Sequence, residues 1–342
     1  MSVSKTVALG ISGGVDSSVA AYLLKKMGYN VIGIFLELGH PMPKHLPLVM
    51  EKLGITWIKM PLTISFSKTV IEKTLQMYKE GYTPNPCTIC NRDAKMKGLY
   101  EAMKNLGADY MATGHYSQVA HKTPYGNALL KKDSDNPKDQ TYFLALIDRN
   151  IVKHLIFPLN GMKKEEIYAI AEDIGILPLI GKKESQDICF SKKMSDFLKH
   201  HLGEKSGKVV LYPENIVVGH HRGTHLYTVG EKLGAHPKTH ERLYVIKKKD
   251  NTLYVAPKTY LLKTTVKLFD INMFVDNLPM EGLLLQTRYR GPLAEIKYID
   301  GNIVKLENGI QATPGQIGAV FDREGHLLMG GIIEGGDNLE NI

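Results

Sequence analysis

Cysteine is scarce in this sequence: the 342 residues contain three, Cys87, Cys90 and Cys189. So small and odd a number excludes the disulfide framework of small secreted domains and favours a reducing compartment, where cysteines are structural, metal-binding or catalytic. No apolar run approaches the roughly 20 residues of a membrane helix. The first six residues carry neither a signal-peptide core nor an Arg-rich transit segment. We therefore expect a cytoplasmic protein with no membrane partner.

Compositional bias is also lacking. Hydrophobic residues make up 43% and charged residues 23% of the chain, which excludes disordered, collagen-like and coiled-coil classes. The one imbalance is a net charge of +8, from 43 Lys and Arg against 35 Asp and Glu. Residues 204–262 hold ten of these bases and five acids, a difference of +5. A basic excess favours an anionic partner, such as a nucleotide or a nucleic acid.

The first ~200 residues alternate between strand-like runs and helical spacings, and the length predicts two or three domains. The expected strands are residues 7–11, 31–36, 55–61 and 110–113. The expected helices are residues 16–27, 46–53, 66–81, 92–106 and 162–174. Such alternation is typical of βαβ units, so we predict an α/β domain with a parallel sheet covered on both faces.

The pattern changes near residue 203, after which short β-rich runs replace the helical spacings. These runs are residues 209–212, 243–247, 253–256, 265–269, 283–289, 295–299, 303–305, 319–321 and 327–333. Turn residues separate them, including Asp300-Gly301-Asn302 and Glu307-Asn308-Gly309. Short strands at regular spacing predict a sandwich or a small barrel.

A glycine-serine loop directly follows the first expected strand and opens the first helix: Ser12-Gly13-Gly14-Val15-Asp16-Ser17-Ser18. Its backbone N–H groups and the helix N-terminus would bind an anion, which the two glycines allow to approach closely. No Gly-Lys-Ser/Thr and no GxGxxG occurs, so it is neither a Walker loop nor a dinucleotide fingerprint. An ordinary glycine turn with Asp16 or Ser12 as helix cap is the alternative. The pattern is similar to the PP-loop of the N-type ATP pyrophosphatases, which bind ATP, adenylate a substrate and release pyrophosphate.

Two of the cysteines lie in the segment Asn85-Pro86-Cys87-Thr88-Ile89-Cys90-Asn91-Arg92. Cys90 stands close to the start of the expected helix 92–106, with Arg92 nearby. Both features favour a thiolate and hence a nucleophile. The alternative for Cys-x-x-Cys is half of a structural zinc site, which needs four ligands. Only one more cysteine remains, and histidine could complete the set.

The third cysteine ends the segment Glu184-Ser185-Gln186-Asp187-Ile188-Cys189. A lone cysteine is more often a small buried apolar residue. Beside Cys90 and an ATP loop, however, a second remote cysteine indicates sulfur handling. One thiol would carry sulfane sulfur, and the other would form the leaving disulfide.

Five motifs occur in order along the chain: SGGVDS at 12–17, TPNPCTICNR at 83–92, TGHY at 113–116, KDQTYFL at 138–144 and SQDICF at 185–190. This series resembles the tRNA-specific 2-thiouridylase (MnmA) family across nearly the whole chain. The resemblance implies a PP-loop catalytic domain at 1–203, a small central β-rich domain that contacts tRNA at 204–262, and a C-terminal β-barrel at 263–342. It also implies that the 2-oxygen of the wobble uridine, position 34 of tRNA, is replaced by sulfur at the expense of ATP.

The resemblance assigns roles residue by residue. It places ATP on Gly10, Ile11, Ser12, Gly13, Gly14, Val15, Asp16, Ser17, Leu36 and Gly114. Cys189 would bear a persulfide and Cys90 would pair with it. The implied tRNA contacts are Asn85, Pro86, Cys87, His115, Lys138, Asp139, Gln140, Arg288, Tyr289 and Gln316. Mg²⁺ is expected with the pyrophosphate. The sulfur donor would be a cysteine desulfurase or a sulfur-relay protein, and a monomer is expected.

This sequence departs from the family at Cys87, where some members carry an aspartate proposed as an acid/base group. Asp187 is a candidate substitute. The segment 36–47 also looks shorter than in relatives. With Cys87 present, the three cysteines could instead hold a [4Fe–4S] cluster whose fourth iron binds hydrosulfide. The sequence leaves the persulfide and the cluster mechanisms open.

Two other functional classes remain as alternatives. Another PP-loop enzyme, such as a tRNA lysidine synthase or a GMP or NAD synthetase, would not need two separated cysteine motifs. A non-enzymatic RNA-binding protein would not need an intact Ser12, Asp16 and Ser17.

Overall fold

The N-terminal part of the chain is built on a five-stranded parallel sheet of order β3-β2-β1-β4-β7. The computed structural model describes residues 4–133, 136–181, 189–191 and 193–335. The strands are β1 (Thr6–Gly10), β2 (Asn30–Glu37), β3 (Thr56–Pro61), β4 (Tyr110–Ala112) and β7 (Leu155–Ile156). The expected parallel sheet is confirmed. Strand β7 was not expected, because two residues are too few to show a period.

Helices cover both faces of this sheet, as the alternation along β1 requires. Val7 and Leu9 pack with α1 (Val15–Lys26), α2 (Leu46–Leu53) and α8 (Lys164–Asp173). Ala8 points to the opposite face and packs with α6 (Met96–Asn105). Both faces are therefore buried, which fits the continuous apolar runs of these strands.

Two long helices are interrupted by π-helical turns. The first consists of α3 (Thr63–Phe66), η1 (Ser67–Glu72) and α4 (Lys73–Lys79). The second consists of α5 (Pro86–Cys90), η2 (Asn91–Lys95) and α6. It begins at Pro86 rather than at the expected residue 92. Asn85 caps it by accepting the N–H of Thr88 at 3.2 Å, and proline suits the first helical position. Cys90 therefore lies inside a helix, not before one.

The remaining short elements of this part connect the sheet to the rest of the molecule. They are the hairpin β5 (Gln118–Ala120) and β6 (Leu129–Lys131), the 3₁₀ turn η3 (Thr141–Leu144), and the helices α7 (Arg149–Val152), α9 (Leu177–Ile180) and α10 (Met194–Leu202). None of the described helices is both long and apolar enough to cross a membrane.

A second sheet, of order β10-β11-β12-β8-β9, forms the middle of the chain. Its strands are β8 (Gly207–Leu211), β9 (Ile216–His221), β10 (Lys232–Ala235), β11 (Arg242–Lys249) and β12 (Thr252–Ala256), with the 3₁₀ turns η4 (Thr224–Leu226) and η5 (Lys258–Leu261) beside them. It has a small core of its own around Leu211, Val245 and Val255. The sequence missed β9 and β10. Both are edge strands with at most one buried side chain, so they show no apolar alternation.

The C-terminal part is a closed six-stranded barrel of order β13-β16-β15-β14-β17-β18, which confirms the expected barrel. Its strands are β13 (Leu262–Met273), β14 (Leu284–Gln286), β15 (Leu293–Asp300), β16 (Ile303–Gln311), β17 (Ile317–Phe321) and β18 (Leu327–Ile333). The expected turn at Glu307-Asn308-Gly309 is wrong, because these residues lie within β16. Lys263 pairs with Ile310 and Thr265 pairs with Lys305. The β16 residues between these two pairs, which include Glu307-Asn308-Gly309, therefore form a large bulge.

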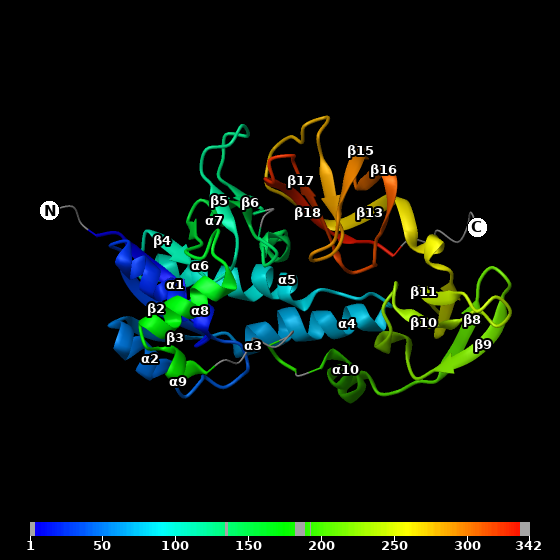
Figure 1. Ribbon diagram of the computed structural model, residues 1–342, viewed down its shortest axis with the longest axis horizontal. Coiled ribbons are helices and arrows are strands. Elements are labelled where there is room, and N and C mark those ends of the chain that lie inside the picture. The colour runs from blue at the N-terminus through cyan, green and yellow to red at the C-terminus, as the bar shows by residue number, and fades with distance from the viewer. Residues whose placement is uncertain (1–3, 134–135, 182–188, 192, 336–342) are drawn as a thin grey trace.

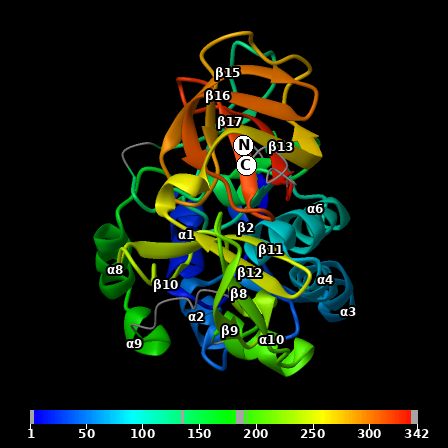
Figure 2. The same cartoon turned by 90° about the vertical axis from the view of Figure 1, so that its right-hand side faces the viewer.

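The barrel is docked on the N-terminal domain through a shared core. Figure 1 shows the barrel above α5, and Figure 2 shows the middle sheet below the barrel and against the rest of the molecule. Buried residues of the barrel and of the α6 face of the sheet form one continuous cluster. Gly330 packs so closely that a Cβ there would overlap the carbonyl oxygen of Ala145. The Tyr142 hydroxyl lies 3.0 Å from both the carbonyl oxygen and the amide nitrogen of Ile317.

Candidate active site

The site begins at the point where the strand order of the sheet reverses. β1 is flanked by β2 on one side and by β4 on the other. The loops that follow β1 and β4 therefore lie side by side at the carboxyl ends of these strands, which is the place where open α/β sheets bind their ligands. The glycine-serine loop follows β1, and Thr113-Gly114-His115 follows β4.

The glycine-serine loop is held by its own hydroxyl groups. The Oγ atoms of Ser12 and Ser17 lie 3.1 Å apart, and the hydroxyls of Ser17 and Ser18 both donate to the carbonyl oxygen of Gly14. Gly14 is the N-cap of α1, and Gly13 has a φ of +81° that favours glycine. Neither Asp16 nor Ser12 is the N-cap, so the alternative of a helix cap by one of these side chains is wrong.

Gly114 brings the two loops into contact. A Cβ at this residue would lie 3.1 Å from the backbone of both Asp16 and Ser17. Backbone atoms move aside less readily than a flexible side chain, so this close approach favours glycine here. Leu36, expected beside the adenine, is buried near the carboxyl end of β2.

Asp16 is an ion-pair and hydrogen-bond centre at the start of α1. Its Oδ1 accepts from Lys164 Nζ at 2.7 Å and from the Tyr116 hydroxyl at 2.8 Å. Burial and the neighbouring carboxylate raise the pKa of Tyr116, which keeps this hydroxyl a donor. Sequence reasoning missed Lys164, because a lysine at the start of an exposed helix looks like a solvated residue.

Cys90 is buried, at 6% exposure, inside the helix that starts at Pro86. Burial raises the pKa of its thiol to about 12. The expectation that Arg92 favours the Cys90 thiolate is wrong. The Arg92 guanidinium instead pairs with Asp93 at 2.8 Å and with Asp270 of the barrel at 2.7 Å.

Lys95 is the cation that acts on the cysteines, and sequence reasoning missed it. Its charge opposes the burial that raises the pKa of Cys90, and it acts in the same way on Cys189. The π-helical turn η2 between Cys90 and Lys95 explains this placement. At about 4.4 residues per turn, a residue five positions on returns to nearly the same face, whereas an α-helix would turn it away.

Cys189 approaches Cys90 from a segment 99 residues further along the chain. The negative charges of the Cys189 and Cys87 thiolates both act on Cys90 and contribute to its raised pKa, so the three thiols share one neighbourhood. Cys189 is exposed as a residue, yet burial around its sulfur raises the pKa of this thiol. Phe190 fixes the segment, with ring centroids 6.2 Å from Phe66 and 5.0 Å from Phe197. Residues 184–188, with the candidate base Asp187, lie outside the described residues.

Four implied tRNA contacts lie in or near this region with different surroundings. His115 packs edge-on against Phe157, and burial together with the charge of Lys95 lowers the pKa of its imidazole well below the usual value. Asp139 is buried and accepts hydrogen bonds from its own loop, and burial raises the pKa of its carboxyl to about 6. Gln140 accepts the N–H of Tyr116 at 3.1 Å, while Lys138 is exposed.

Tyr289 of the barrel comes close to the cysteine helix. Its ring centroid lies 4.5 Å from that of Phe143, whose carbonyl oxygen accepts from Asn91 Nδ2 at 3.0 Å. Asn91 directly follows Cys90, so the structure brings these parts together. Arg288 beside Tyr289 is exposed, and the Arg290 guanidinium lies 4.9 Å above the tyrosine ring.

Gln316 lies at the joint between the barrel and the segment that enters the cysteine helix. Its Nε2 donates to the carbonyl oxygen of Thr83 at 2.7 Å. Thr83 lies two residues before Asn85 in the segment that continues through Pro86 to Cys87, so the residue that Gln316 contacts is close in sequence to three other implied tRNA contacts.

No three His, Cys, Asp or Glu side chains within the described ranges are arranged to hold a metal ion. As they stand, Cys87, Cys90 and Cys189 therefore do not fit an iron–sulfur cluster, and the same holds for a structural zinc ion.

Comparison with known proteins identifies the family. A family model described as the tRNA methyl transferase HUP domain matches residues 5–193, and one described as the tRNA methyl transferase PRC-barrel domain matches residues 195–257.

Full-length relatives carry a more specific name. The tRNA-specific 2-thiouridylase MnmA of Persephonella marina is 40% identical, over 95% of this chain and 98% of that protein. The MnmA of Hydrogenobaculum sp. is 37% identical over the same shares, and that of Aquifex aeolicus is 35% identical over 96% and 98%. The chain therefore belongs to the MnmA family of tRNA-specific 2-thiouridylases and is a sulfurtransferase.

Proposed function

We propose that this enzyme replaces the 2-oxygen of the wobble uridine, position 34 of tRNA, by sulfur and converts ATP to AMP and pyrophosphate. The observation that carries the proposal is the approach of Cys90 and Cys189, 99 residues apart, around Lys95. The charge of Lys95 also reaches His115, in the loop whose Gly114 touches the PP-loop. Neither a synthetase without sulfur chemistry nor an inert RNA-binding protein would need both features.

In the first half-reaction the C2 oxygen of uridine attacks the α-phosphorus of ATP, and pyrophosphate leaves. Ser12, Gly13, Gly14 and Ser17 would hold the phosphates through backbone N–H groups and hydroxyls, with Mg²⁺ on the pyrophosphate. Gly10, Ile11, Val15, Asp16, Leu36 and Gly114 complete the proposed ATP site. Adenylation is needed because the amide-like oxygen of uracil is otherwise a poor leaving group.

In the second half-reaction a persulfide on Cys189 delivers sulfur. The terminal sulfur attacks C2 of the adenylated base, AMP leaves with the old oxygen, and the base stays linked to Cys189 through a disulfide. Cys90 then attacks the Cys189 sulfur and forms a Cys90–Cys189 disulfide. The electron pair of the broken sulfur–sulfur bond leaves with the 2-thiouridine. Two thiols are oxidised and the sulfane sulfur is reduced, so the enzyme must be reduced before the next turnover.

The thiol chemistry suits an ordered sequence. Since burial raises the pKa of Cys90 to about 12, this residue is a protonated thiol at neutral pH. It would therefore not attack the persulfide of Cys189 before substrate arrives. The charge of Lys95 favours the thiolate of both cysteines. Exposure of Cys189 allows a sulfur-donor protein, such as a cysteine desulfurase or a relay protein, to reach it.

The tRNA is proposed to lie across the three parts of the chain, with the target base splayed out of the anticodon loop. We take these parts as domains of residues 1–203, 204–262 and 263–342 in a monomer. The proposed contacts are Asn85, Pro86, Cys87, His115, Lys138, Asp139, Gln140, Arg288, Tyr289 and Gln316. Tyr289 and Phe143 supply an aromatic surface beside Asn91, which suits stacking of an unpaired base.

The test uses single variants and two separate readouts. Cys90→Ala and Cys189→Ala should each abolish thiolated tRNA while adenylation of tRNA survives. Asp16→Ala and Ser17→Ala should instead block the release of AMP and pyrophosphate. Full thiolation by either cysteine variant would refute the sulfur-transfer roles. The family model's description names methyl transfer to tRNA. Labelled methyl groups in tRNA after incubation with labelled S-adenosylmethionine would refute the proposed function.

Anaerobic purification with iron and sulfide analysis separates the persulfide from a cluster. The expected result is iron well below one atom per chain, with thiolation supported by a cysteine desulfurase. Stoichiometric iron together with thiolation from free sulfide would support the cluster in place of the persulfide.

A further inference from the structure

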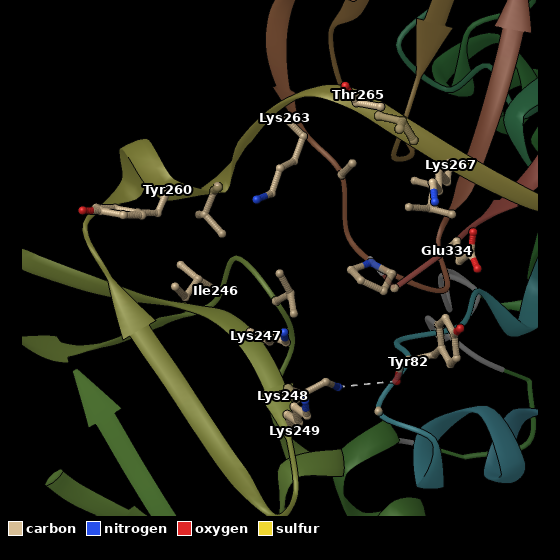
Figure 3. Close-up of a pocket in the computed structure, with 18 of the residues that line it drawn as sticks. Tyr82, Ile246, Lys247, Lys248, Lys249, Tyr260, Lys263, Thr265, Lys267 and Glu334 are labelled. Atoms are coloured by element: carbon tan, nitrogen blue, oxygen red, sulfur yellow. Dashed lines mark hydrogen bonds between the residues drawn. The ribbon is translucent and has the colours of Figure 1, made fainter. Parts of the chain in front are cut away.

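A cavity of about 260 Å³ lies where the three parts of the chain meet. Figure 3 shows Tyr82, which follows α4, on one side, Lys247 and Lys248 of β11 on a second, and Lys263 of β13 above them. No cysteine and no residue of the glycine-serine loop lines it, so it is separate from the active site. Sites for drug-sized ligands measure roughly 300–1,000 Å³, so this cavity suits a smaller group, such as a phosphate.

The wall of the cavity is strongly basic. Its charged residues are five lysines and two glutamates, which gives an excess of +3: Lys247, Lys248, Lys249, Lys263, Lys267, Glu80 and Glu334. The residues come from three separate parts of the chain, so folding has brought the lysines together against their mutual repulsion. A concave cluster of one sign concentrates counter-ions and is stabilised by a bound anion.

Lys263 shows the repulsion most clearly. Its side chain is half-buried, and both burial and the nearby charge of Lys247 lower the pKa of its ammonium group. Within the described ranges, Lys263 has no carboxylate or carbonyl oxygen as a side-chain partner. Its four-carbon stem carries a point charge into the cavity (Figure 3).

Lys248 supplies a fixed charge at the same cavity. Its Nζ lies 3.0 Å from the carbonyl oxygen of Tyr227, and 3.4 Å from both the carbonyl oxygen of Tyr82 and the hydroxyl of Thr83. Burial lowers the pKa of Lys248 to about 8, so most of it is charged at neutral pH. The cavity therefore combines a rigid ammonium group on its floor with a less restrained one, that of Lys263, above.

We propose that this cavity binds a backbone phosphate of the tRNA substrate. The inference rests on the proposed function, which supplies the tRNA. Lysine binds phosphate as a point charge, and phosphate contacts set the position of a nucleic acid without reading its sequence. Tyr82 and Thr83 lead into Asn85 and the cysteine helix. A phosphate held here would fix the RNA strand beside the segment that carries the cysteines.

The experiment measures tRNA binding by Lys247→Gln, Lys263→Gln and the double variant. The control is Lys104→Gln, at an exposed position of α6. We expect the Kd for unmodified tRNA in the double variant to rise on the order of ten-fold near 100 mM salt. The slope of log K against log salt should become shallower by about 0.7–0.9, the change expected when the contact to one phosphate is lost. The Kd for ATP should not change, and neither should tRNA binding by Lys104→Gln.

Three outcomes would overturn the inference. One is a double variant that melts as the wild type does and keeps its Kd and salt slope. Another is a Lys104→Gln variant that weakens binding as much as the double variant, because bulk charge would then explain the effect. The third is binding of inorganic pyrophosphate that the double variant loses while tRNA binding stays intact, which would mean a site for a free anion.

Failure of the proposed function looks different. A wild-type enzyme that binds this tRNA but does not thiolate it would refute the function. An active wild type with an unaffected double variant would refute the phosphate site alone.

Discussion

The backbone N–H of Thr83 donates to the carbonyl oxygen of Pro314 at 2.8 Å, which ties the segment entering the cysteine helix to the barrel. Gln316 adds its amide donor to the Thr83 carbonyl at 2.7 Å, and Lys248 of the middle sheet reaches the Thr83 hydroxyl at 3.4 Å. Gly315 allows this contact, because a Cβ there would lie 2.8 Å from the Thr83 nitrogen. Two parts of the chain that are proposed to hold tRNA thus fix one residue that precedes the cysteines.

Replacing Gln316 by alanine should loosen this joint and displace the start of the cysteine helix. We expect kcat for thiolation to fall about three- to ten-fold with the Kd for ATP unchanged, because one hydrogen bond is worth roughly 1 kcal/mol. The measurement is single-turnover thiolation at saturating tRNA. Gln76→Ala, on the exposed face of α4, is the matched control. A rise in the KM for tRNA at constant kcat would instead mean that Gln316 acts through its proposed contact to the RNA and not through the joint.

Gly114→Ala should weaken ATP binding while the protein still folds. The new Cβ would lie 3.1 Å from the backbone of Asp16 and Ser17, so it would push the phosphate loop away from the loop after β4. We expect the Kd for ATP to rise at least ten-fold, measured by calorimetry. Gly219→Ala is the control, since a Cβ there meets only Val209 at 4.0 Å. Wild-type affinity in the Gly114 variant would show that the two loops can separate without cost to the site.

The sequence predicted the sheet, the barrel and the motifs, because each depends on a local pattern. Helix 46–53 and strand 327–333 were predicted at their observed ends. The helix buries its apolar residues at helical spacing, and the strand is a short apolar run that is buried throughout. The edge strands β9 and β10 were missed because their side chains are exposed. The bulge in β16 was read as a turn because Asn308-Gly309 is a common turn pair.

The electrostatics of the cysteine site could not be predicted in the same way. Arg92 is closer to Cys90 in sequence than Lys95 is, so the sequence favours Arg92 as the cation that stabilises the Cys90 thiolate. Its guanidinium, however, is held by Asp270, 178 residues away, and a π-helical turn brings Lys95 to the cysteine side. Both facts depend on tertiary contacts and backbone geometry that no local pattern carries.

Lys95→Met should slow the chemistry of both thiols. The lysine charge lowers the pKa values of Cys90 and Cys189, so loss of this charge raises both pKa values further. At any pH below the pKa, a smaller fraction of each cysteine is then thiolate. We expect a several-fold lower rate of iodoacetamide modification at Cys189 and a comparable loss in thiolation, with adenylation retained. Mass spectrometry after timed alkylation between pH 7 and 9 measures the rates.

Arg92→Gln is the matched control for Lys95→Met. Arg92 pairs with two carboxylates, and one of them, that of Asp270, is exposed. Exposed ion pairs add little stability, so we expect the free energy of unfolding to fall by only about 1 kcal/mol. The alkylation rates of the cysteines should stay as in the wild type. If Arg92→Gln slowed alkylation and Lys95→Met did not, the assignment of the activating cation would have to be reversed.

The order of cysteine modification follows from burial and pKa. Cys189 is exposed, whereas Cys90 is buried and its pKa is about 12, so Cys189 should react first with iodoacetamide at pH 8. Modification of Cys90 should rise about ten-fold per pH unit from pH 7 to 9 without a plateau, because its thiolate fraction grows at that rate below the pKa. Peptide mapping gives the order. Faster labelling of Cys90 than of Cys189 in the native protein would contradict the buried position of the Cys90 thiol.

Tyr142→Phe tests the docking of the barrel on the N-terminal domain. The buried hydroxyl of Tyr142 lies 3.0 Å from both the amide nitrogen and the carbonyl oxygen of Ile317, so its removal leaves two buried backbone groups without this partner. Unsatisfied buried polar groups cost roughly 1–3 kcal/mol each, and we expect the free energy of unfolding to fall by at least 1 kcal/mol. Tyr298→Phe, at 48% exposure on β15, should change stability by less than about 0.5 kcal/mol. Equal denaturation midpoints for the two variants would show that the hydroxyl adds nothing to the docking, and the shared apolar core alone would then hold the barrel in place.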